Sequence, residues 1–237
     1  MKLGIIGAMK VEVDSLKENM QNKSVATCAG MEFCQGELEG LEVVVVQCGV
    51  GKVNATMCAQ ILCVSYGVTH LVNTGIAGSL CNELDIGDLV VSRDAIYHDF
   101  DITNWGRAIG EVPGMGVTAF PADETMMDCA CAAAESINPG HTRIGRIASG
   151  DQFVCSREKK EKIIADTRAI CTEMEGAAIA HTAYRNDVPF VILRAISDKA
   201  DDSAEMDYPT FEAIAARRCA EVTMELAQKL KEKTERN

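Results

Sequence analysis

The chain alternates between short apolar runs and longer stretches in which apolar residues recur at helical spacing. The run at residues 190–193, entered by Pro189, is apolar at consecutive positions, which is typical of a strand buried on both faces of a parallel sheet. Similar runs predict strands at residues 3–6, 71–74, 88–94 and 142–148. Alternating segments separated by glycines predict a meander at residues 24–28, 32–37 and 43–48.

Helical patterns lie between these strands. Apolar positions at helical spacing are Val13, Leu16 and Met20, then Val53, Met57, Ile61 and Val64, and finally Phe211, Ile214, Ala215, Val222, Leu226 and Leu230. Further helices are predicted at residues 125–134, 157–165 and 173–184, and residues 231–237 are expected to be a solvated end. We therefore expect one α/β domain over residues 1–237, with a mixed, largely parallel twisted sheet flanked by helices.

Composition removes several classes of partner. Hydrophobic residues make up 47% of the chain, and a net charge of −12 argues against nucleic acid, because phosphate neutralisation needs a basic face. No apolar run reaches the length of a membrane span, and the first run is too short for a signal peptide. The 11 cysteines form no Cys-x-x-Cys pair, and the 4 histidines show no metal-ligand spacing. We expect a cytoplasmic protein with reduced cysteines and without a metal, nucleic-acid or membrane partner.

Polar residues gather where the predicted strands end. The strand-end segments are residues 7–12, 75–79, 149–154 and 194–198, and the carboxyl ends of parallel strands form the ligand crevice of open α/β sheets. Arg194 and Asp198 share one face of an extended strand, whereas Ser197 points the other way unless the chain bends. The pair also fits a surface salt bridge at the strand exit.

Three acids, Glu12, Glu175 and Asp198, fall at or near this predicted rim. Two carboxyl groups in different environments can divide into an acid and a base. Burial can keep one protonated so that it donates to a leaving group, while an ionised one activates water. The pattern therefore favours proton transfer and the binding of hydroxyl groups.

Simpler motifs do not explain the chain. Gly49-x-Gly51-x-x-x-Ala55 follows a strand, but its third small residue is one place late for a dinucleotide fingerprint, and no acid stands near the end of the next strand. A P-loop and the Gly-x-Ser-x-Gly elbow of serine hydrolases are both absent from the sequence.

Seven segments carry a family resemblance: residues 4–9 with Glu12, 49–53, 73–78, 97–99, 149–153, 173–176 and 194–198. In this order, over about residues 1–230, they resemble the 5′-methylthioadenosine/S-adenosylhomocysteine nucleosidases of the purine nucleoside phosphorylase-like superfamily. The resemblance implies an enzyme that hydrolyses the N-glycosidic bond of these adenosine thioethers, releases adenine and a 5-thioribose product, and uses no cofactor.

The resemblance also implies roles for individual residues. Asp198 matches the general acid that protonates adenine N7, and Glu12 matches the base that activates water, with the catalytic Arg194 nearby. Glu175 matches the carboxylate that binds the ribose hydroxyls. The other implied substrate-binding residues are Glu173, Met174, Phe153, Val154, Ser197, Ala77, Gly78, Val50, Ile102, Trp105, Pro113 and Tyr208. The segment 102–113 would complete the site of a neighbouring subunit, which implies a homodimer.

Two positions depart from the family pattern. Ile76 stands where serine is common in the family. Arg107 stands where an aromatic residue is common, and its charge would favour a substrate with a carboxylate tail, such as S-adenosylhomocysteine. The alternatives are a phosphate-dependent nucleoside phosphorylase, a nucleosidase for a futalosine-type or other 5′-modified substrate, and a sensor without turnover. A phosphorylase is disfavoured because no arginine precedes Arg93 and Glu12 would repel phosphate.

Overall fold

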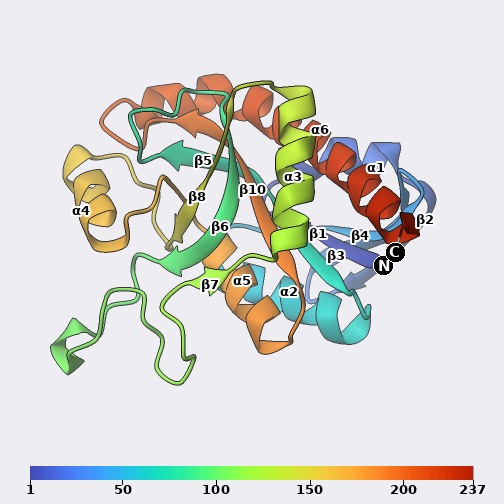
Figure 1. The fold of residues 1–237 in the computed structure, drawn as a ribbon, viewed down its shortest axis with the longest axis horizontal. Helices are drawn as coiled ribbons and strands as arrows, with labels where there is room; N and C mark the ends of the chain where they lie inside the picture. Colours follow the sequence, from blue (N-terminus) through green and yellow to red (C-terminus); the bar gives the residue numbers. More distant parts are fainter. Residues whose placement is uncertain (237) are drawn as a thin grey trace.

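The computed structural model describes residues 1–236, which form a sheet with helices around it (Figure 1). The strands are β1 (Lys2–Gly7), β2 (Gln21–Cys28), β3 (Met31–Leu38), β4 (Leu41–Gln47), β5 (His70–Ser79), β6 (Leu89–Tyr97), β7 (Phe120–Pro121), β8 (Thr142–Ser149), β9 (Cys171–Glu173) and β10 (Phe190–Asp198). The helices are α1 (Lys10–Asn19), α2 (Lys52–Ser65), η1 (Thr103–Trp105), α3 (Glu124–Ile137), α4 (Arg157–Thr167), α5 (Gly176–Arg185) and α6 (Ala204–Arg236).

The strands form one mixed sheet. β4, β1, β5 and β10 pair in parallel, and β2 and β3 continue from β4 as the predicted antiparallel meander. β10 also pairs antiparallel with β6, which continues through β8 to β9, and β9 returns antiparallel to β5. The predicted mixed α/β sheet is confirmed, and half of it closes into a ring of strands.

Helices cover both faces of this sheet. α6 packs on β10, β5, α1 and α3, whereas α2 and α5 pack together on the opposite side. Figure 1 shows α6 and α1 along the top and right, and α2 and α5 along the lower edge. Each face has its own apolar core, built by inward-facing strand residues and by the small residues of the helices. Within the described residues, no helix combines the length and apolar character needed to cross a bilayer.

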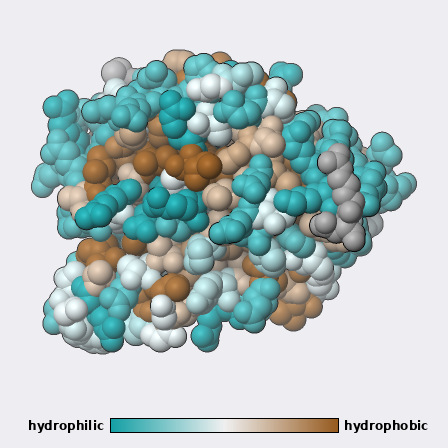
Figure 2. All heavy atoms as spheres, viewed as in Figure 1, coloured by the Kyte–Doolittle hydropathy of each residue, from teal (hydrophilic) through white to brown (hydrophobic). Residues whose placement is uncertain are grey.

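Two predicted helices present different faces from those expected. The buried residues of α2 are Ala55, Cys58, Ala59 and Leu62, so that Val53 and Val64 are 70% and 71% exposed. Small residues let this helix approach its neighbours closely. Because apolar residues also stand on its other faces, the sequence pattern did not identify the face that is buried. The lower edge of Figure 2 is brown where α2 lies. Ile214 of α6 is also exposed, and α6 continues helically through the predicted solvated end to Arg236.

The strand ends also differ from the prediction. β5 and β10 continue to Ser79 and Asp198, so the polar residues expected after these strands lie inside them. The register of β10 against β5 shifts between Ile196 and Asp198, which makes Ser197 the extra residue of a β-bulge. The segment between β6 and β7 extends away from the sheet at the lower left of Figure 1.

Candidate active site

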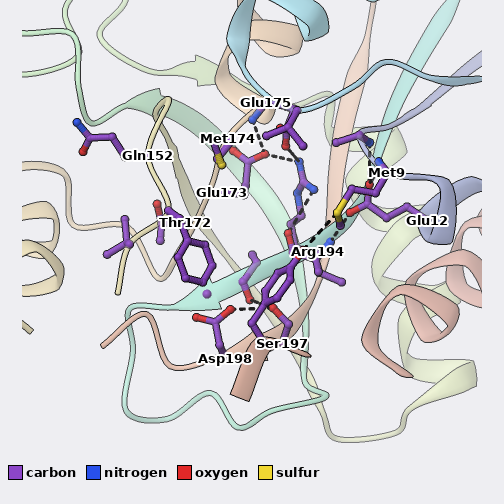
Figure 3. A pocket seen from close by; sticks show the side chains of 18 residues that line it. Met9, Glu12, Gln152, Thr172, Glu173, Met174, Glu175, Arg194, Ser197 and Asp198 are labelled. Atoms are coloured by element: carbon purple, nitrogen blue, oxygen red, sulfur yellow. Dashed lines mark hydrogen bonds and ion pairs between the residues drawn. The ribbon is translucent and has the colours of Figure 1, made fainter. Parts of the chain in front are cut away.

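A cavity of about 600 Å³, open to solvent, lies at the carboxyl ends of β1, β5 and β10. Figure 3 shows Ser197 and Asp198 at one end, Glu173, Met174 and Glu175 at the other, and Glu12 with Met9 along the side. The strand ends therefore meet around one hollow, as expected of an α/β sheet.

Glu12 is held in the first turn of α1 with its carboxylate turned back toward the sheet. Its Oε2 accepts hydrogen bonds from Ala8 N at 2.7 Å and Met9 N at 2.9 Å, and its Oε1 accepts one from Ile76 N at 3.1 Å. Glu12 is only 1% exposed, and this burial raises its pKa even though Arg194 and the backbone donors oppose the shift. A carboxylate whose pKa is raised in this way is a stronger base than an exposed one, so it is better suited to take a proton from water.

Arg194 is a buried residue of the cavity lining. Its Nη2 donates to Asn73 Oδ1 and Glu173 Oε2, and its Nη1 donates to Ile76 O at 3.3 Å. Burial opposes the charge, but the carboxylates of Glu173, Glu175 and Glu12 raise its pKa, so the guanidinium stays charged. The alternative of a surface salt bridge with Asp198 is wrong, because Arg194 is 1% exposed and pairs with Glu173.

Glu173 uses both carboxylate oxygens inside the protein. Oε1 accepts from Ser149 Oγ, and Oε2 accepts from Arg194, from Glu175 N at 3.0 Å and from Gly176 N at 2.7 Å. These contacts fix the N-terminus of α5 to the arginine, because the first backbone N–H groups of a helix need acceptors. Glu173 therefore orients the residues on either side of it.

Glu175 directly precedes α5 and lines the cavity. Its Oε1 accepts from Gly51 N at 2.8 Å, and its Oε2 lies 3.7 Å from Arg194 Nη2. Burial, followed by repulsion from Glu173, raises the pKa of Glu175 to about 7. A carboxylate held this way accepts hydrogen bonds from hydroxyl groups, and ligand hydroxyls would favour its charged form.

Asp198 lies at the end of β10 directly after the bulge. Its Oδ2 accepts from Ser197 Oγ at 2.8 Å, and its Oδ1 accepts from Ala200 N at 2.8 Å. Asp198 is 2% exposed, and burial raises its pKa against these two donors. A carboxyl group with a raised pKa is suited to donate a proton to a bound ligand.

Two glycines allow the acids to approach the sheet. A Cβ on Gly75 would lie 2.3 Å from Glu12 Oε1 and 2.4 Å from Arg194 Nη1. A Cβ on Gly78 would lie 2.7 Å from Asp198 Oδ1. Only glycine leaves room for these contacts.

An aromatic pair forms the wall next to Asp198. The rings of Phe153 and Tyr208 meet edge to face with centroids 5.5 Å apart, and Tyr208 OH donates to Met9 Sδ at 3.3 Å. Flat aromatic and thioether surfaces suit a flat apolar ring. The cavity thus combines buried carboxyl groups with an apolar slot.

Comparisons with known proteins agree with this geometry. The model of the Phosphorylase superfamily matches residues 2–228. A 5′-methylthioadenosine/S-adenosylhomocysteine nucleosidase of Shewanella sediminis (strain HAW-EB3) is 38% identical over 232 residues, which cover 97% of this chain and 100% of that protein. This chain belongs to the 5′-methylthioadenosine/S-adenosylhomocysteine nucleosidase family. The predicted family resemblance is confirmed.

Solved structures of this nucleosidase family superpose closely. The Neisseria meningitidis nucleosidase in complex with methylthio-immucillin-A has a TM-score of 0.93 and 34% identity, and the match covers 96% of this chain and 98% of that one. A futalosine hydrolase of Helicobacter pylori has a TM-score of 0.92 and 31% identity over 97% of this chain and 98% of that one. The fold is therefore shared by proteins named for different substrates.

Most of the residues expected from the nucleosidase resemblance line the cavity of this one chain. They are Glu12, Val50, Ala77, Gly78, Phe153, Val154, Glu173, Met174, Glu175, Arg194, Ser197, Asp198 and Tyr208. Ile102, Trp105 and Pro113 do not line it, since they belong to the segment that extends from the sheet, where Trp105 is 72% exposed. The cavity also contains Ala8, Met9, Ile76, Gln152 and Thr172, which were not predicted as site residues.

The missed residues differ in the signal that the sequence offered. Met9 and Gln152 stand inside motifs that carry the family resemblance, so they could have been included. Thr172 lies in β9, a strand of 3 residues that gives no periodic pattern. Asn73, which binds Arg194, also stands inside one of these motifs, residues 73–78.

Proposed function

We propose that this protein hydrolyses the N-glycosidic bond of 5′-methylthioadenosine and S-adenosylhomocysteine. The family membership supports the reaction class. The observation that carries the proposal is the pair of buried carboxyl groups, Glu12 and Asp198, at different sides of one cavity, each with a pKa raised by burial. An acid for the leaving base and a base for water are what glycoside hydrolysis requires.

Asp198 is the proposed general acid. Its proton passes to N7 of the adenine, and the bond between C1′ and N9 then breaks with its electron pair on the base. Adenine leaves as a neutral molecule. The edge-to-face pair of Phe153 and Tyr208 beside Asp198 supports this orientation, because it offers an apolar surface to the purine ring.

Glu12 is the proposed base. It takes a proton from water as the oxygen attacks C1′, which leaves a hydroxyl on the ribose. The charged Arg194, whose Nη1 binds the carbonyl of Ile76, stands close to this carboxylate and favours its ionised form, which is the form that can accept the proton. Glu175 receives the ribose hydroxyls, which positions C1′ against the water.

The same charges argue against a phosphorylase. A phosphate at the position of the water would face Glu12 and Glu175, and the nearby Arg194 is already paired with Glu173. Water, which is neutral, carries no such penalty. Retention of Glu12 and Asp198 also disfavours a sensor that binds without turnover.

We also propose that the protein is a homodimer in which the segment 102–113 of one subunit reaches the site of the other. Val53, Met57 and Val64 form an exposed apolar stripe along α2. Val50, just before this helix, is 48% exposed and lines the cavity. A partner seated on α2 would therefore cover the cavity mouth, where a 5′-alkylthio group needs apolar contacts.

The free cysteines support a reducing compartment, which we propose to be the cytoplasm.

The test is product analysis with several substrates. Purified protein is incubated with methylthioadenosine, S-adenosylhomocysteine or futalosine, each with and without phosphate, and the released base and sugar are identified. We expect free adenine from the first two, with a sugar product that carries no phosphate. Exclusive turnover of futalosine, which the similarity to futalosine hydrolase makes the leading alternative, would replace the proposed substrate. Dependence on phosphate would overturn hydrolysis.

A further inference from the structure

The segment after Asp198 has an unusual backbone conformation. Ala200 has a φ of 50°, in the left-handed region that residues other than glycine rarely adopt. In this conformation its N–H donates to Asp198 Oδ1 at 2.8 Å. A left-handed alanine is unfavourable and persists only where the surroundings fix it. The orientation of Asp198 therefore depends on the contacts that hold the peptide unit between residues 199 and 200.

Lys160 of α4 binds the other end of this peptide unit. Its Nζ donates to Lys199 O at 2.6 Å and lies 3.6 Å from Asp201 Oδ2. The carbonyl of residue 199 and the N–H of residue 200 belong to one peptide group, so one amide connects the ammonium to the carboxyl group of Asp198. A cation on the carbonyl oxygen polarises the amide and strengthens its N–H as a donor.

Lys160 lies on the buried face of α4. It is only 9% exposed, which is rare for a lysine, and it shares the buried face of α4 with Ile163 and Thr167. Ile163 packs in the same apolar cluster as Ala200. The side chain of Lys199 also donates to Leu84 O at 2.6 Å. The segment is thus held by contacts with α4 and with the loop between β5 and β6.

We propose that Lys160 is a positioning residue that orients the carboxyl group of Asp198 through the peptide unit 199–200. This inference rests on the proposed function, in which Asp198 is the acid. With the N–H fixed on Oδ1, the proton is confined to Oδ2, the oxygen that Ser197 contacts. Lys160 thereby selects which oxygen faces the leaving base.

The test compares two substrates on the same protein sample. The adenine of methylthioadenosine needs protonation to leave, whereas the nitrophenolate of a 4-nitrophenyl glycoside of 5-methylthioribose leaves without an acid. The ratio of the two kcat values does not depend on the fraction of folded protein. Lys160→Met keeps the aliphatic stem without the charge, and Lys160→Arg keeps the charge. Lys162→Met is the control, since Lys162 is on the same helix, 69% exposed, and pairs with Asp166.

We expect Lys160→Met to lower the ratio of adenine release to nitrophenolate release about tenfold, which is part of the roughly 10²–10⁴-fold that general acid catalysis contributes. Lys162→Met should leave the ratio unchanged, and Lys160→Arg should restore most of it. A fall of less than about threefold in Lys160→Met would overturn the proposal, since general acid catalysis exceeds that. If this variant is insoluble, Lys160→Gln is judged by the same threshold. A wild-type protein that cleaves the nitrophenyl glycoside but releases no adenine would instead refute the proposed function.

Discussion

Ser197 Oγ lies 2.8 Å from Asp198 Oδ2, although the two residues are neighbours in one strand. Successive residues of a regular strand point to opposite faces, so this contact exists because Ser197 is the extra residue of a β-bulge. The hydroxyl group of Ser197 can donate to a lone pair of Oδ2 whether the carboxyl group is ionised or protonated. The single proton of the acid therefore stays available to the leaving base, and Ser197 stays bound through the proposed proton transfer.

We predict that Asp198→Asn lowers kcat for methylthioadenosine by roughly 10²–10⁴-fold, the usual contribution of general acid catalysis. The amide keeps the shape but has no proton to give. KM should change little, and steady-state adenine release measures both constants. Ser197→Ala, which retains the acid, should cost much less. Equal losses in the two variants would contradict the assignment of the acid to Asp198.

The pH dependence of kcat/KM should be bell-shaped. Burial raises the pKa of Glu12 and, with Glu173, brings that of Glu175 to about 7. Both must be ionised to act, so kcat/KM should fall as the pH drops below about 7. Because the two carboxyl groups interact, the midpoint of this acidic limb belongs to the pair and not to either residue alone. Asp198 must be protonated, so activity should also fall as the pH rises through its raised pKa.

Glu175→Gln separates the contributions of Glu12 and Glu175 to the acidic limb of the kcat/KM profile. It removes one titration and one negative charge near Glu12, so the limb should move to lower pH while KM rises. The rate is measured between pH 5 and 9, and protein incubated at each pH is re-assayed at pH 7 to confirm that it has not unfolded. An acidic limb that stays in place would exclude Glu175 from the titration.

The sequence allowed the strands and the rim to be predicted because buried parallel strands appear as uninterrupted apolar runs. It did not identify the partner of Arg194, since Asp198 stands nearby in the chain whereas Glu173 is brought in by β9. That strand has 3 residues, too few for a periodic pattern. The bulge at Ser197 and the buried position of Lys160 were equally hidden, because both depend on pairing and packing between distant segments.

Gly75→Ala should abolish most activity without unfolding the protein. The added Cβ would lie 2.3 Å from Glu12 Oε1, so the carboxylate or Arg194 must move. We expect a loss of about 100-fold or more in kcat/KM, since misplacement by an ångström can cost that much. Gly30→Ala is the control, because Gly30 has open space around it and φ of 75°. Similar losses in both variants would show that the effect is not local.

Arg107 tests the preference for the 5′ substituent. Its Nη1 lies 2.6 Å from Glu111 Oε1, so part of its charge is already neutralised. If the segment 102–113 reaches a neighbouring site, Arg107→Ala should lower the ratio of S-adenosylhomocysteine to methylthioadenosine turnover, because the carboxylate tail loses a cation. Glu111→Gln should raise that ratio. Unchanged ratios in both variants would remove Arg107 from substrate selection.

The apolar stripe of α2 predicts how subunits associate. Met57→Glu should convert the proposed dimer to a monomer, because a two-fold contact on α2 would bring two buried carboxylates together. Sedimentation equilibrium measures the mass, and the same sample should show a raised KM for methylthioadenosine, since the cavity mouth loses its cover. Ile214→Glu is the control, because Ile214 is 59% exposed on α6 and lies outside this stripe. A wild-type monomer, or a Met57→Glu dimer with normal KM, would show that α2 is not the interface.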